Sequence, residues 1–227
     1  MPPTTLRTPN ITDRPAVRRL AELATYGHGA QSMIEGVGDT ARSGYQDADK
    51  LNYERRSTGE KGVFNCLASM RIADYHGQPV GLSYTAPPLY SITTASGFTQ
   101  QEDFNALAGA LTELNLLAVM PRFRGRGVGA QLLTDVETRY AAAGYRTLFI
   151  QTATYADPRL IPWYTAHGYT FAEPGQPWEL RYYTGDTLTG RLDRHDKDEV
   201  IGFKALAPGV TVTGGAVPEV TGILDKP

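Results

Sequence analysis

Apolar side chains recur at helical spacing in two segments of the chain. The first begins near Pro15, a residue typical of a first helical turn, and places Val17, Leu20 and Leu23 on one face. The second lies between two glycines and has apolar residues four positions apart. Its apolar positions are Val128, Leu132, Val136 and Tyr140. Each segment therefore predicts an amphipathic helix with its apolar face turned inward.

Apolar or alternating runs bounded by turn residues predict strands. The unbroken apolar run at residues 148–150 is typical of a strand buried on both faces in the middle of a sheet. A turn at residues 76–78 predicts a hairpin between its two flanking strands. The expected strands are residues 5–7, 63–75, 79–85, 114–120, 147–152 and 178–183. Shorter helices are expected at residues 101–111 and 162–167, and one irregular helix with loops within residues 30–60.

The composition excludes several classes of protein. The 227 residues suffice for a sizeable core, in one domain with an appendage or in two small domains. The 22 basic and 24 acidic residues give a formal net charge of -2, whereas a dedicated nucleic-acid-binding protein carries a strong basic excess. The single cysteine, Cys66, excludes an intramolecular disulfide and a multi-cysteine zinc site, and the four histidines lack metal-ligand spacing. We therefore expect no metal and no nucleic-acid partner.

The same composition bears on location. No apolar run approaches the roughly 20 residues that a membrane span requires, and the first residues lack the apolar stretch of a secretion signal. We therefore expect a cytoplasmic protein with no membrane partner.

The stretch with the clearest chemistry joins an apolar strand to the second helix. Three glycines and three arginines alternate there, and no acidic residue lies between Glu113 and Asp135. These are Arg122, Arg124, Arg126, Gly125, Gly127 and Gly129. Glycines let a ligand approach the backbone, and a helix start presents unpaired N–H groups and a favourable dipole. The pattern therefore predicts a site for a phosphate-bearing ligand.

The spacing argues against two common phosphate ligands. A P-loop requires Gly-Lys followed by Ser or Thr at the helix start, and none is present. A dinucleotide-binding fold requires an acidic residue about 20 positions on, where Gln151 and Thr152 stand.

Two motifs instead resemble the GCN5-related N-acetyltransferase (GNAT) superfamily. One is Arg124-x-x-Gly127-x-Gly129, preceded by Val119-x-Pro121. The other is the stretch 161–169, Ile-Pro-Trp-Tyr-Thr-Ala-His-Gly-Tyr, which is similar to the superfamily's short helix. The resemblance implies an α/β (mixed α+β) fold with a mostly antiparallel central sheet, two splayed parallel strands, and helices on both faces. It also implies direct transfer of an acetyl group from acetyl-CoA to a primary amine.

The resemblance implies a role for each part of the glycine turn and its strand. The turn would hold the CoA diphosphate, and the strand backbone would pair with the pantetheine arm. The implied cofactor-binding residues are Leu117, Ala118, Val119, Arg124, Gly125, Arg126, Gly127, Val128, Gly129 and Ala130.

The resemblance also implies catalytic residues. Tyr164 stands where the family motif carries a tyrosine and would act as the general acid for the leaving thiolate, with a packing role as the alternative. Glu113, six residues before Val119, would act as the general base, and a solvated strand-end residue is its alternative. Asn115 lies on the same strand face as Glu113 and would orient substrate or water. Asp157 falls where members often carry an asparagine, and we expect it only to form a turn with Pro158.

The acceptor region implied by the resemblance is residues 26–60 and 163–183. Carboxylates with aromatic rings suit a cationic amine, so a small-molecule acceptor bound by Glu35, Trp163 and neighbours such as Trp178 is expected, against the alternative of a solvated acidic surface. Two other functions stay open, namely a protein N-terminal or lysine acetyltransferase and a regulatory acyl-CoA-binding module. The expected state is a monomer or homodimer.

The resemblance ends near residue 183, which predicts an acetyltransferase domain at residues 1–183 and a C-terminal extension at residues 184–227. Five basic and seven acidic residues give this extension the whole net charge of the chain. Residues 200–206 and 210–213 read as two strands about a turn, an arm built as a β-hairpin. It would extend the sheet, cap the acceptor cleft or pack across a dimer.

Overall fold

A computed structural model describes most of the chain. The described residues are 4–24, 50–54, 63–67, 69–86, 88, 101–153, 156–174, 176–184, 186–192, 198–215 and 218–224. The chain divides into two compact units, which we describe separately. The first unit comprises residues 1–50, 67–86 and 114–139, and the second comprises residues 51–66, 87–113 and 140–227.

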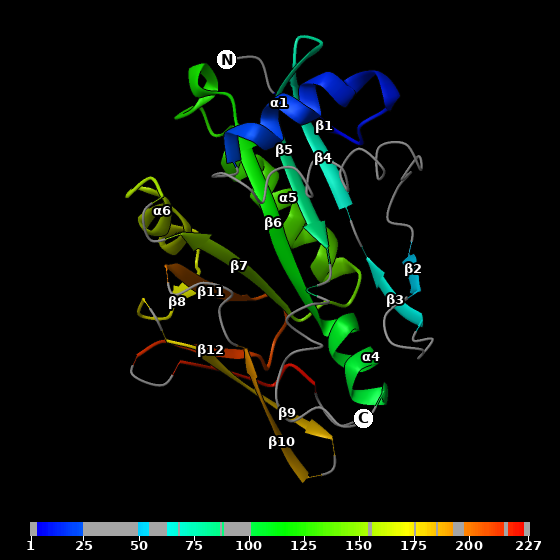
Figure 1. Cartoon of the computed structure of the whole chain (residues 1–227), viewed down its shortest axis with the longest axis vertical. Helices are drawn as coiled ribbons and strands as arrows, with labels where there is room; N and C mark the ends of the chain where they lie inside the picture. The colour runs from blue at the N-terminus through cyan, green and yellow to red at the C-terminus, as the bar shows by residue number, and fades with distance from the viewer. Residues whose placement is uncertain are drawn as a thin grey trace. The chain divides into compact units, whose positions relative to one another are not determined.

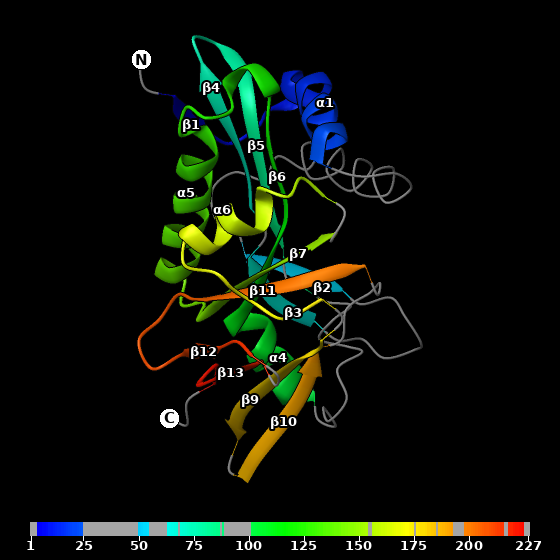
Figure 2. The ribbon, with the colours of Figure 1, turned by 90° about the vertical axis from the view of Figure 1, so that its left-hand side faces the viewer.

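The first unit is a sheet with a helix on each face. Its hydrogen-bonded strands, in spatial order, are β1 (Thr5–Arg7), β4 (Ser69–Tyr75), β5 (Gln78–Ala86) and β6 (Leu111–Val119). Figure 1 shows β4, β5 and β6 side by side. The expected hairpin of β4 and β5 is confirmed, and its turn has positive φ at His76 and Gly77. Helix α1 (Arg14–Ala24) and helix α5 (Val128–Ala142) cover opposite faces of the sheet (Figure 2).

Close packing fixes α5 against β5. A Cβ atom at Gly81 would lie 2.9 Å from Leu132 Cδ1 and 3.0 Å from Val128 Cγ1, so a larger residue there would force these side chains to shift. The predicted inward face of α5 is confirmed, because its apolar side chains are buried. On α1, Val17 and Leu20 are buried, but Leu23 is 39% exposed and the prediction for it was wrong.

The second unit is built around strand β7 (Thr147–Ala153). The first three residues of β6 pair with it in parallel, from Leu111–Thr147 to Glu113–Phe149. Strand β11 (Glu199–Ala205) pairs antiparallel with β7 along its whole length (Figure 2). It also pairs antiparallel with β8 (Thr170–Phe171). Helix α4 (Gln101–Ala110) leads into β6, and helix α6 (Leu160–Ala166) precedes β8. The expected burial of β7 is confirmed.

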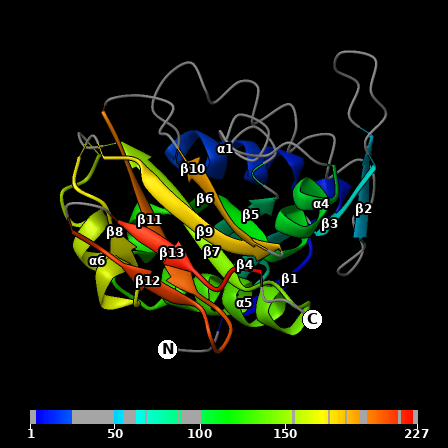
Figure 3. The ribbon, with the colours of Figure 1, turned by 90° about the horizontal axis from the view of Figure 1, so that it is seen from below.

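The neighbour of β7 comes from the C-terminal part of the chain, which the sequence left open as one of three roles. Residues 178–183 do form a strand, β9 (Trp178–Thr184), but it belongs to a separate four-stranded sheet. That sheet has the order β10 (Asp186–Leu192), β9, β13 (Glu219–Thr221) and β12 (Thr211–Thr213) (Figure 3). The predicted hairpin of residues 200–206 and 210–213 was wrong, because β11 pairs with β7 and β12 pairs with β13. Of the three roles considered for the C-terminal extension, the one observed is extension of a sheet, because β11 pairs with β7.

Side chains and backbone of β11 contribute to the core of the second unit. The rings of Phe149 on β7 and Phe203 on β11 stack with their centroids 5.3 Å apart, and both are fully buried. Trp178 packs against Phe203 at 4.7 Å and donates its indole N–H to the carbonyl of Ile201 at 2.9 Å. Trp178 is fully buried, so it fills this core rather than lining an acceptor site.

Two further strand predictions need correction. The single strand expected at residues 63–75 is two strands, β3 (Val63–Leu67) and β4, which lie in different sheets. Within residues 30–60, where an irregular helix was expected, residues 50–54 form strand β2 (Lys50–Glu54), which pairs with β3. The rest of that helix prediction lies outside the described residues.

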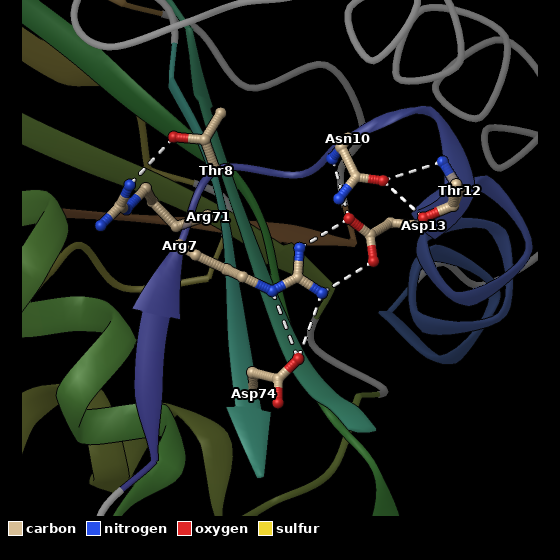
Figure 4. A network of polar contacts seen from close by, with 7 residues as sticks. All are labelled: Arg7, Thr8, Asn10, Thr12, Asp13, Arg71 and Asp74. Carbon is tan, nitrogen blue, oxygen red and sulfur yellow. Dashed lines mark hydrogen bonds and ion pairs between the residues drawn. The ribbon is translucent and has the colours of Figure 1, made fainter. Parts of the chain in front are cut away.

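A partly buried ion-pair network joins β1, β4 and the 3₁₀ turn that precedes α1. Arg7 donates to both carboxylate oxygens of Asp13, at 2.6 and 2.8 Å, and to Asp74 at 3.1 Å (Figure 4). The Asp13 carboxylate also accepts a hydrogen bond from the backbone N–H of Asn10 at 2.8 Å. Asn10 directly precedes the 3₁₀ turn at Ile11–Asp13. The hydrogen bond from Arg7 holds the pKa of Asp13 below its usual value, although burial opposes this shift.

We predict that Asp13→Asn destabilises the protein by about 1–3 kcal/mol at pH 7, because a charge-assisted bond to a buried carboxylate is lost. A depressed pKa contributes stability that is present above about pH 4 and is lost as pH falls through the folded-state pKa. The difference between wild type and variant in urea unfolding should therefore shrink between pH 5 and pH 2. The control is Glu22→Gln, on the exposed face of α1. A difference independent of pH would contradict the account.

We predict that a chain ending at residue 184 does not form the second unit. All seven residue pairs between β11 and β7 would be lost, and Phe149 would lose its stacked partner. Thermal unfolding and near-ultraviolet circular dichroism should show loss of cooperative aromatic packing. A truncated chain that melts at the wild-type temperature would show that β11 is dispensable.

Candidate active site

Strand β6 presents two different faces. Its buried face carries Leu114, Leu116 and Ala118, whereas Glu113, Asn115, Leu117 and Val119 alternate with them and are half-buried. The side-chain oxygen of Asn115 is buried and has no hydrogen-bond partner among the described residues. Because an unpaired buried carbonyl oxygen is costly, this atom is a ready acceptor for a ligand or water N–H or O–H group.

The turn after β6 is tied back to the strand. The N–H of Met120 donates to Val80, and Pro121–Phe123 form one 3₁₀ turn. The Arg124 Nε then donates to the carbonyl of Val119 at 3.1 Å. Arg124 thus braces the turn, while the rest of its exposed guanidinium keeps donors for a ligand.

The two glycines of the turn have conformations that other residues adopt at a cost. Gly125 and Gly127 have φ of +70° and +82°, and a Cβ atom at either would meet nothing within 4 Å. The first helical hydrogen bond of α5 runs from Gln131 N–H to Gly127, so the amides of residues 128–130 precede it and lack intrahelical partners. No acidic residue lies in the first turn of α5, and glycine supplies no capping side chain.

This geometry fits a diphosphate. Exposed backbone at Gly125 and Gly127 leaves open space beside the amide groups of a helix N-terminus, where anions bind favourably. Among the residues named from the sequence, residues 124–127, 129 and 130 are exposed or half-buried at this turn, whereas the Val128 side chain is buried.

Phe123 contributes to this surface and was missed in the sequence. The guanidinium carbons of Arg122 and Arg126 lie over its ring, 5.0 and 5.6 Å from the centroid. The ring itself is buried, so it holds two exposed cations beside the turn. The sequence signal was an aromatic residue within the alternating arginines.

Tyr164 is held in a cluster of aromatic rings in the second unit. Its ring lies 4.8 Å from Trp163 and 5.4 Å from Tyr169, both in edge-on geometry, and 6.5 Å from Phe171. Tyr164 is only 6% exposed, and burial raises the pKa of its hydroxyl well above the usual value. The hydroxyl therefore stays protonated at neutral pH, which is the state that a general acid needs.

The half-buried Trp163 is fixed beside Tyr164. Its ring lies 4.2 Å from that of His167, and the Nδ1 of His167 is 2.7 Å from the Trp163 carbonyl. Since a carbonyl only accepts, Nδ1 carries the proton of this hydrogen bond. The tryptophan ring is thus held on one turn of helix next to the candidate acid.

Three further residues were named from the sequence, and the structure describes two of them, Glu113 and Asp157. Glu113 is half-buried at the last register pair of the parallel ladder, opposite Phe149. Asp157 accepts the N–H of Arg159 at 3.0 Å and pairs with its guanidinium, which confirms its role in a turn. Glu35 lies outside the described residues.

The described part of the chain contains no group of three or more potential metal ligands among histidine, cysteine and acidic side chains. No helix in it is long and apolar enough to cross a membrane.

Comparisons with known proteins identify the family of this chain. The model of the acetyltransferase (GNAT) family matches residues 39–169, more than half of the chain, and no curated protein matches. A GNAT-family structure from Desulfovibrio desulfuricans is 17% identical with a TM-score of 0.53, covering 90% of this chain and 99% of that chain. Phosphinothricin acetyltransferase from Sinorhizobium meliloti, solved with AcCoA, is 18% identical with a TM-score of 0.50, covering 91% and 90%.

A ribosomal-protein-alanine N-acetyltransferase from Brucella melitensis is also similar, at 16% identity and a TM-score of 0.50, covering 88% of this chain and 99% of that chain. These likenesses show the fold, and the predicted GNAT fold is confirmed.

We predict that Gly127→Ala weakens CoA binding at least tenfold. Alanine at φ of +82° costs about 1–2 kcal/mol and places a methyl group in the open space beside the helix amides. Isothermal titration calorimetry with CoA measures the change.

The matched control is Gly144→Ala, where φ is +90° and a Cβ would likewise meet nothing within 4 Å, but no helix begins. Both variants should lose similar stability, and only Gly127→Ala should lose affinity. Equal CoA affinity in the two variants would contradict a diphosphate site at this turn.

Proposed function

The chain belongs to the GNAT acetyltransferase family, and from that premise we propose that it transfers an acetyl group directly from acetyl-CoA to the primary amine of a small molecule. The observation that carries the proposal is the glycine turn, whose open backbone and uncapped helix start fit a diphosphate. A cytoplasmic location and a monomeric or homodimeric state remain predictions.

Residues of the turn and of β6 would hold the cofactor. The amides of residues 128–130 and the space beside Gly125 and Gly127 would receive the diphosphate, and Arg124 and Arg126 would add charged donors. The backbone of Leu117, Ala118 and Val119 would pair with the pantetheine arm. Acetyl-CoA, when bound, supplies a thioester carbonyl as electrophile and a thiolate as leaving group.

Tyr164 would supply the proton for the leaving thiolate. Its buried hydroxyl is protonated at neutral pH, and its ring is held on three sides by aromatic neighbours. Glu113 would take the ammonium proton of the acceptor, directly or through water, because only a neutral amine attacks a carbonyl. Asn115, two residues on, would orient the amine or that water with its unpaired side-chain oxygen.

The half-buried Trp163 beside Tyr164 supports a cationic amine as the acceptor, because a ring face attracts an ammonium group. Glu35 remains a proposed partner for the same charge. The alternative acceptor is a protein N-terminus or lysine, and the similar structures include a ribosomal-protein-alanine and a phosphinothricin enzyme. A regulatory acyl-CoA-binding module is the alternative from another class.

A thiol-release assay with acetyl-CoA tests the proposal. A panel of small amines and a panel of peptides with free N-termini or lysines serve as acceptors. Turnover on small amines with higher kcat/KM than on peptides is the expected result. The reverse preference would favour a protein acetyltransferase, and CoA binding without turnover on either panel would favour the regulatory module.

We predict that Tyr164→Phe lowers kcat by about 10²–10⁴-fold while the KM for acetyl-CoA changes little, because only the proton donor is lost. In the wild type, kcat should not fall as the pH reaches 10, since burial keeps this hydroxyl protonated beyond the usual tyrosine range.

The control for the lost hydroxyl is Tyr140→Phe, at a buried tyrosine of α5. A Tyr164→Phe enzyme with wild-type kcat would assign the tyrosine a packing role only.

A further inference from the structure

The end of α6 is held by a cap that includes the candidate acid. Gly168 has φ of +89° and donates its N–H to Thr165, while the Tyr169 N–H reaches back five residues to the carbonyl of Tyr164 at 3.1 Å. This is a Schellman motif, and its usual side-chain contact is present as the pair of Tyr164 and Tyr169 rings. The backbone and the ring of Tyr164 are therefore both fixed by the cap.

One carbonyl of the cap is bound from another part of the chain. The Nζ of Lys204, on β11, donates to the carbonyl of His167 at 2.7 Å and lies 5.7 Å from the centroid of the Tyr169 ring. A cation at a helix C-terminus also interacts favourably with the helix dipole. Lys204 thus contacts both residues that flank the left-handed Gly168.

Lys204 is positioned by regular strand pairing. It stands opposite Leu148 in the seven-residue ladder of β11 and β7, next to the buried Phe203. Its side chain runs along Gly168, where a Cβ atom would lie 3.4 Å from the lysine Cε. The lysine therefore ties a short helix to a central strand of the second unit.

We infer that Lys204 is a positioning residue for Tyr164, so that a segment beyond the expected acetyltransferase domain completes its catalytic machinery. The inference rests on the proposed role of Tyr164 as general acid. Lys204 holds the C-terminal end of α6 through its contacts with His167 and Tyr169, and the cap at this end holds Tyr164. Small displacements of a catalytic group reduce rates strongly, so this contact acts on kcat rather than on cofactor affinity.

The experiment compares Lys204→Met, which keeps the apolar stem, with Lys204→Arg, which keeps a cationic donor. The methionine variant should lower kcat roughly tenfold with an unchanged KM for acetyl-CoA, and the arginine variant should recover most of that loss. The matched control is Arg146→Met, because Arg146 also donates to backbone carbonyls of the second unit, those of Gly222 and Pro208. It should lose stability without a loss of kcat.

A double-mutant cycle shows whether Lys204 acts through the tyrosine. In the Tyr164→Phe background, Lys204→Met should cause no further loss of kcat. An equal loss in both backgrounds, or a lower melting temperature with unchanged kcat in the single variant, would overturn the inference.

A readout without turnover separates this inference from the proposed function. Hydrogen exchange at the Tyr169 amide, which donates to the Tyr164 carbonyl, should accelerate at least tenfold in Lys204→Met and not in Arg146→Met. Accelerated exchange in a chain with no acetyl transfer would refute the proposed function and leave the structural link intact. Unchanged exchange in Lys204→Met would overturn the inference whatever the activity.

Discussion

The candidate cofactor turn depends on the packing of α5 on β5, which is close at Gly81. A Cβ atom there would meet the side-chain ends of Leu132 and Val128, in the first two turns of the helix, and would force them to shift. Since Val128 is also the first residue of α5, this packing fixes where the free amides of the helix start stand relative to the end of β6. The positive φ of Gly125 and Gly127 then leaves backbone rather than side chains facing the open space.

The acid role proposed for Tyr164 in the second unit depends on burial rather than on charge. Tyr164 lies among aromatic rings, and its hydroxyl is kept protonated because the apolar surroundings disfavour a phenolate. The short helix that carries it has seven residues, too few to be stable alone, so its geometry depends on the cap at Gly168 and on contacts from β8 and β11. The position of the proposed acid therefore depends on the strands that contact its helix.

Local signals in the sequence predicted much of the fold and of the candidate site. The apolar spacing from Val128 to Tyr140 and the glycine turn depend on neighbouring residues only, and both are found where expected. Strand partners are set by contacts far apart in sequence, so the place of β11 beside β7 and of β9 in another sheet were missed. Leu23 matched the helical period yet is exposed, because the period does not show how far a covering surface extends. The role of Lys204 depends on that long-range pairing and had no local signal.

The central claim is that the glycine turn holds the diphosphate of acetyl-CoA and that Tyr164 protonates its sulfur. A crystal structure of the protein with bound CoA tests both parts most directly. We expect the diphosphate on the amides of residues 128–130 beside Gly125 and Gly127, and the CoA sulfur within hydrogen-bonding distance of the Tyr164 hydroxyl. Diphosphate density away from this turn, or a sulfur that Tyr164 does not reach, would contradict the account.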